Sequence, residues 1–88
     1  MVKIVVDLER ALVAVDAEMH ADLEELLLEE GSQQMDLWGA NVYFEGPVFL
    51  EFTSLINIRP GQGNRSMEVQ DPALRAQIEA LVRQFILS

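Results

Sequence analysis

The strongest constraint on the fold is the alternation of apolar and polar residues around one short turn. Residues 37–44 repeat with the two-residue period of a β-strand that buries one face. Glu45-Gly46-Pro47 supplies the turn, and residues 48–58 alternate again until Pro60. The sequence therefore predicts a hairpin of two antiparallel strands. One face of its return strand carries Leu50, Phe52, Ser54, Ile56 and Ile58.

The first 15 residues are rich in β-branched side chains. Two such runs, Val2 to Leu8 and Ala11 to Val15, flank Glu9-Arg10. This pattern favours a second hairpin, because valine and isoleucine prefer strands. A continuous helix is the competing interpretation.

Residues 18–30 fit two structures. Met19, Leu23, Leu26 and Leu27 recur at helical spacing, and Gly31 stands where a helix C-cap is expected. Residues 19–24 also alternate apolar and polar, as a strand does. The sequence alone does not decide between helix and strand.

The last third of the chain predicts a loop and a helix. Residues 59–70 lack periodicity and contain proline and glycine, which indicates a loop of about a dozen residues. Asp71-Pro72 then opens a helix that we expect to run to Leu87. Its apolar stripe contains Leu74, Ile78, Leu81, Val82 and Phe85.

These elements predict one α+β domain spanning residues 1–88. We expect a two-layer arrangement in which the C-terminal helix packs on one face of a four-stranded antiparallel sheet. The helix should meet Leu50, Phe52, Ile56 and Ile58. If residues 18–30 are helical, the order becomes ββαββα, with both helices on the same face. With one helix or two on that face, the other face would expose Leu37, Tyr43 and Leu55, which predicts a weak homodimer.

Charge and composition exclude several classes of function. The chain has 15 acidic and six basic residues, so it lacks the basic surface of a nucleic-acid or anionic-membrane binder. It has no cysteine, which excludes disulfides and thiolate chemistry. No apolar run is long enough for a membrane span or a signal sequence. We expect a complete, small, cytoplasmic protein.

The predicted loop is the best candidate for a ligand site. Residues 57–88 hold four arginines and three acids, whereas residues 1–56 hold 12 acids and two bases. Guanidinium, carboxamide and hydroxyl groups beside glycines are suited to phosphate or carboxylate. We expect a non-enzymatic binding module for an anion such as a nucleotide or coenzyme A, or for a protein partner that contacts the loop arginines. The candidate ligand-binding residues are Asn57, Arg59, Gln62, Asn64, Arg65 and Ser66, with Trp38 as a stacking surface or, alternatively, a core residue.

Two alternatives compete with this interpretation. The loop arginines can instead pair with the protein's own carboxylates, so that the loop braces the fold of a structural or regulatory homo-oligomer. A hydrolase using His20 is the other alternative, because Asp22 and Glu24 would share its face on a strand. The pattern predicts no metal site and names no cofactor.

Several segments resemble a family of small bacterial proteins of unknown function that has cyanobacterial members. The most specific is Asn57-Ile58-Arg59-Pro60 with Gln62-Gly63-Asn64-Arg65-Ser66-Met67-Glu68. His20-Ala21-Asp22 and residues 36–40 add to the resemblance, which covers nearly the whole chain. The family pattern has a glycine run near Val15 and a cysteine near Leu23, and this chain has neither. The resemblance tilts residues 18–30 toward strand and implies no reaction.

Overall fold

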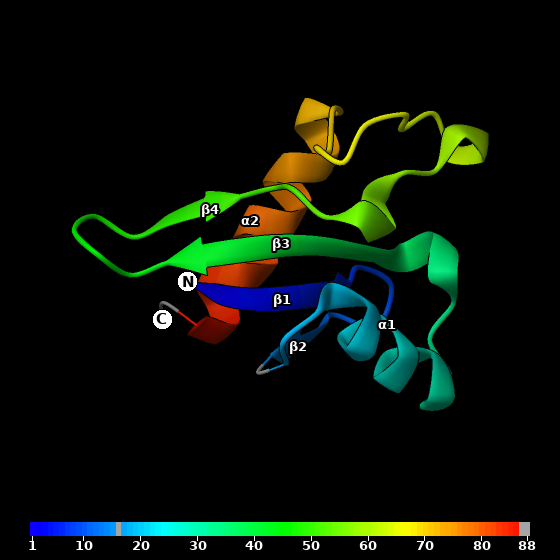
Figure 1. The fold of residues 1–88 in the computed structure, drawn as a ribbon, viewed down its shortest axis with the longest axis horizontal. Helices are drawn as coiled ribbons and strands as arrows, with labels where there is room; N and C mark the ends of the chain where they lie inside the picture. Colours follow the sequence, from blue (N-terminus) through cyan, green and yellow to red (C-terminus); the bar gives the residue numbers. More distant parts are fainter. Residues whose placement is uncertain (16, 87–88) are drawn as a thin grey trace.

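The computed structural model describes residues 1–15 and 17–86. Its four strands form one antiparallel sheet in the order β2-β1-β3-β4 (Figure 1). The strands and α-helices are β1 (Val2–Asp7), β2 (Leu12–Val15), α1 (His20–Glu29), β3 (Leu37–Tyr43), β4 (Phe49–Glu51) and α2 (Pro72–Ile86). Three short 3-10 turns are η1 (Gln34–Asp36), η2 (Leu55–Asn57) and η3 (Pro60–Gln62). The fold class and the N-terminal hairpin are therefore confirmed.

The ambiguous segment forms helix α1. Leu23 and Leu27 lie one turn apart and are buried against β1 and β3. Gly31 follows the helix with a φ of 105°, a left-handed conformation in which glycine carries no steric penalty. The helical alternative is thus confirmed, and the tilt toward strand is wrong. Burial of the leucine pair outweighs the short alternating pattern before it.

The two helices lie on opposite faces of the sheet (Figure 1). Ile4 and Val6 of β1 pack with α2, whereas Val5 between them packs with α1. Adjacent strand residues point to opposite faces, so these clusters form separate cores on each side. The C-terminal helix covers one face, as predicted. The expectation that a second helix joins it there is wrong, and α1 adds a third layer.

The fourth strand is much shorter than predicted. Pairing with β3 covers only Asn41 to Tyr43, opposite Phe49 to Glu51. The chain then makes a single bridge between Thr53 and Glu68 and turns into η2. Ser54 caps this turn, because its Oγ accepts a hydrogen bond from the backbone N–H of Ile56 at 3.3 Å. The predicted strand over residues 48–58 is therefore wrong after Glu51.

Helix α2 begins at the predicted residue. The Asp71 carboxylate accepts a hydrogen bond from the backbone N–H of Ala73 at 2.9 Å, which caps the helix. Residue 87, its expected end, lies outside the described residues. Ile78 and Val82 are fully buried in the core on this face.

Three of the expected contacts of α2 are absent. Phe85 is 54% exposed and Ile58 is 44% exposed, whereas Ile56 packs in the cluster under α1. Ile56 and Ile58 do not contact α2 because β4 ends early. Neither residue lies on a strand face that points toward α2. Leu50 and Phe52 do pack against the α2 core, as predicted.

The apolar face expected to be bare is partly covered. Leu37 is fully buried under α1, and Tyr43 stacks on Phe49 with ring centroids 4.7 Å apart. Leu55 is 69% exposed. The homodimer stays a prediction, although the open sheet face from which it was inferred is largely filled. In residues 1–15 and 17–86, no helix is both long and apolar enough to cross a membrane.

Candidate functional site

The Asn57 side chain takes the place of a strand beside β3. Its Oδ1 accepts a hydrogen bond from the Gly39 N–H at 2.8 Å, and its Nδ2 donates to the Gly39 carbonyl at 2.9 Å. A second donation from Nδ2 reaches the carbonyl of Met67 at 3.1 Å. Strand β4 has already left β3 at this point, so the amide satisfies backbone groups that would otherwise be buried without partners.

Arg59 also binds backbone groups, at the start of β3 and in the segment before it. Its guanidinium and Nε donate to three backbone carbonyls, those of Gln34 at 2.5 Å, Ile56 at 3.0 Å and Leu37. It lies 3.7 Å from the Glu24 carboxylate and 4.6 Å above the Trp38 ring. Burial lowers the pKa of Arg59, and Glu24 opposes that shift. The Arg59 side chain is 8% exposed, so this arginine is engaged inside the protein.

Gln62 and Asn64 also bind backbone groups. Gln62 donates from Nε2 to the carbonyl of Met35 at 2.9 Å. Asn64 donates to the carbonyl of Asn57 at 2.8 Å and accepts from the N–H of Gln70 at 3.0 Å. The same Nδ2 lies 2.9 Å from the carbonyl oxygen of Ser66 and 3.1 Å from that of Glu68, so its two hydrogens are shared among three acceptors. The loop is thus fixed by its own side chains and tied to the segment before β3.

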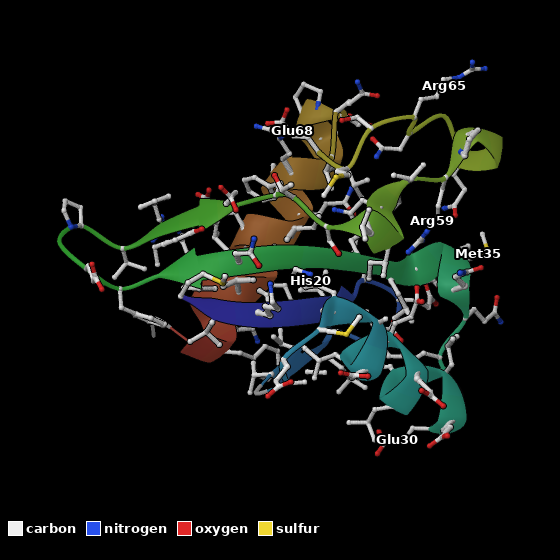
Figure 2. All side chains as sticks on the ribbon, viewed as in Figure 1. His20, Glu30, Met35, Arg59, Arg65 and Glu68 are labelled. Atoms are coloured by element: carbon white, nitrogen blue, oxygen red, sulfur yellow. The ribbon has the colours of Figure 1, made fainter. Side chains whose placement is uncertain are left out.

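The remaining predicted ligand residues are separated by the fold. Trp38 is buried in the core on the α2 face, so the core interpretation of the indole is confirmed. Ser66 accepts from the Glu68 N–H at 3.1 Å. Arg65 is exposed and points away from the body of the protein, whereas Arg59 points back toward β3 (Figure 2). The fold does not bring the two guanidiniums together, and anion binding by this loop stays a prediction.

A pocket of about 300 Å³ opens on the other side of this network, at the start of α1. Its walls come from β1, the first turn of α1, η2 and Met67. Most of the lining is apolar, with a few polar groups among it, as in small-molecule sites. The lining residues are Lys3, Glu18, Met19, His20, Ala21, Ser54, Leu55, Ile56 and Met67.

His20 and Ser54 are buried polar residues of this pocket. His20 is 9% exposed, and its Nε2 lies 2.8 Å from the carbonyl oxygen of Ala40. A carbonyl only accepts, so Nε2 carries the hydrogen and Nδ1 of the neutral ring is an acceptor. Burial lowers the pKa of His20, and the nearby Lys3 lowers it further, against the opposing hydrogen bond to Ala40. Burial therefore favours the neutral form of the ring.

Gly39 lets the pocket floor form. A Cβ at this position would lie 2.7 Å from the Cβ of Ser54 and 3.2 Å from Cδ2 of His20. The missing side chain allows the serine and the imidazole to close over β3. Asn57 holds the Gly39 backbone from the edge, so the loop network fixes the pocket's position.

The catalytic and metal-binding arrangements considered for His20 do not assemble in the described part of the chain. Because α1 is helical, the exposed Asp22 leaves the face that His20 shares with Glu24. No group of three or more metal-ligating side chains gathers among residues 1–15 and 17–86. No hydrogen bond joins His20 to Ser54 in the same ranges, although both line the pocket.

Sequence reasoning missed the pocket because its residues are scattered along the chain. Lys3, His20, Ser54 and Met67 share no motif, and only the fold brings them together. It also missed the buried Asp7. The Asp7 carboxylate accepts from the Ser32 hydroxyl at 2.5 Å and from the Arg10 N–H at 2.9 Å. The available signal was the position of Asp7, an acidic residue at the end of an apolar strand.

The fold and the polar network define a small α+β domain. In it, side chains of a loop form the hydrogen bonds to β3 that a neighbouring strand would otherwise form. The family model described as "Protein of unknown function (DUF5674)" matches residues 1–85, and the chain belongs to this family. No curated protein and no solved structure matches the chain.

Proposed function

We propose that the protein is a small-molecule binding module whose site is the pocket at the start of α1. The observation that carries this proposal is a largely apolar pocket of about 300 Å³ with a buried imidazole in its lining. Ligand pockets typically range from roughly 300 to 1,000 Å³, so the ligand is of metabolite size.

The chemistry of the lining restricts the ligand further. His20 offers an acceptor at Nδ1, and Ser54 offers a hydroxyl hydrogen because its oxygen already accepts from Ile56. Leu55, Ile56 and Met67 supply apolar contact. A ligand with an apolar body and one hydrogen-bonding head group fits this pattern.

The loop supports the site in this proposal. Asn57, Arg59 and Asn64 form hydrogen bonds with backbone groups. These bonds fit the alternative in which the loop braces the fold. They hold the segment from Ser54 to Ile56, and this segment forms one wall of the pocket. These three residues then support ligand binding indirectly, because they position the wall of the pocket.

The test is a panel of small aliphatic carboxylates, amines and amides, followed by calorimetry and ligand-observed NMR. In Ala21→Phe an aromatic ring projects from an exposed pocket residue on the first turn of α1. Binding of any hit should be lost in this variant and kept in Ala76→Phe, a matched change on the exposed side of α2. Equal binding by both variants would refute the pocket as the site.

The predicted anion site in the loop gives a different result in the same assay. Its exposed cation is Arg65, so inorganic phosphate or a nucleotide would bind equally to wild type and Ala21→Phe. That binding would be lost in Arg65→Ala. Saturable phosphate binding with this mutational pattern would favour the loop over the pocket.

A further inference from the structure

The pocket at the start of α1 has opposite charges at one end. Lys3 of β1 and Glu18, just before α1, both line it. Both also line an adjoining hollow of about 320 Å³, together with Met1, Val2 and Ala17. The two charged side chains thus stand where the two hollows meet. No ion pair within 4.0 Å joins Lys3 to Glu18.

The part of the pocket away from the adjoining hollow is largely apolar. Leu55, Ile56 and Met67 line the pocket and not the hollow, and His20 and Ser54 lie against Gly39 in the same lining. A bound molecule therefore meets a cation and an anion on one side and aliphatic groups on the other.

We propose that the ligand is a free α-amino acid with an apolar side chain. Its carboxylate would meet the Lys3 ammonium and the Ser54 hydroxyl, and its ammonium would meet the Glu18 carboxylate and the accepting Nδ1 of His20. Its side chain would lie against Leu55, Ile56 and Met67. This inference rests on the proposed function, because it names the ligand class of the same pocket.

The ligand test compares leucine with two analogues that each lack one charged group. 4-Methylpentanoate keeps the carboxylate and the alkyl chain, and 3-methylbutylamine keeps the ammonium and the alkyl chain. Calorimetry should show that leucine binds at least tenfold more tightly than either. Equal affinities for all three would overturn the amino-acid inference and leave the pocket standing. No binding of any of them at millimolar concentration would overturn both.

Charge-removing variants test which residue meets which group. Glu18→Gln should weaken leucine at least severalfold and leave 4-methylpentanoate unchanged. Lys3→Met should weaken both of these ligands and leave 3-methylbutylamine unchanged. Glu29→Gln, an exposed change at the far end of α1, is the matched control and should alter none of them. Unchanged leucine affinity in Glu18→Gln, with the fold verified by circular dichroism, would overturn the inference.

Discussion

At the scale of single residues, the amide of Asn57 occupies the place where a neighbouring strand would pair with Gly39. A carboxamide carries one acceptor and two donors and so can satisfy both backbone groups of one residue at once. Asn57 is fully buried, and each of its partners loses its hydrogen bond if the amide is removed. This residue should matter more for stability than its place in a polar loop implies.

Asn57→Ala should therefore lower the free energy of unfolding by about 2 to 4 kcal/mol, because it leaves buried backbone groups unpaired. Urea denaturation measures this loss. Gln77→Ala, an exposed change on α2, is the control and should shift stability by less than about 0.5 kcal/mol. A similar small shift for both variants would contradict the bracing role.

His20 gives the protein a defined pH dependence. Because folding lowers its pKa below the usual value of about 6.5, the unfolded state binds the proton more tightly. The contribution of His20 to stability is complete above pH 6.5 and is lost as the pH falls through the lowered pKa of the folded state. The sign would reverse only if folding raised the pKa.

We predict that the stability difference between wild type and His20→Gln shrinks as the pH falls from 7.5 to 5. Urea denaturation at several pH values measures this difference and cancels the titration of the acidic residues common to both proteins. A difference that is constant, or that grows in acid, would show that burial does not dominate the environment of His20.

At the scale of elements, the sequence predicted the helices and strands that local residue patterns determine. β1, β2 and β3 have strong β-branched or alternating patterns, and α2 has a capped apolar stripe. The end of β4 was missed because it depends on side chains such as Asn57 and Arg59, which reach a distant backbone. The sequence singled out the loop residues as a ligand site, and that role stays a prediction. The pocket was missed because it exists only after α1 packs.

The corrected packing of α2 changes which residue should matter in its core. Ile78→Ala should cost about 2 to 5 kcal/mol, because Ile78 is fully buried between α2 and the sheet. Phe85→Ala should cost less than about 1 kcal/mol, since Phe85 is mostly exposed. Thermal or urea unfolding of both variants checks this order. A larger loss for Phe85→Ala would show that the helix end is packed.

At the scale of the whole molecule, the charge is unbalanced but locally organised. The net charge is −9, and three of the four arginines after residue 56 contact glutamates, in the pairs Arg59–Glu24, Arg75–Glu68 and Arg83–Glu79. The last two pairs are exposed and contribute little to stability. Repulsion among the excess carboxylates is therefore the main long-range electrostatic effect on the fold.

Added salt should stabilise the protein. Raising sodium chloride from about 20 mM to about 300 mM shortens the range of repulsion, and the melting temperature should rise by roughly a few degrees. The double variant Glu25→Gln, Glu29→Gln removes two exposed negative charges and should gain less. A melting temperature that falls with salt would mean that the ion pairs outweigh the repulsion.

The central claim is that the polar loop braces the fold while the pocket at the start of α1 binds the ligand. An amide chemical-shift map of the ¹⁵N-labelled protein, titrated separately with leucine and with inorganic phosphate, tests it most directly. We predict that leucine shifts the amides of Ala21, Leu55 and Met67 in a saturable way, and that phosphate leaves residues 59–66 unmoved. Saturable shifts of residues 59–66 with phosphate, and none at the pocket with leucine, would contradict it.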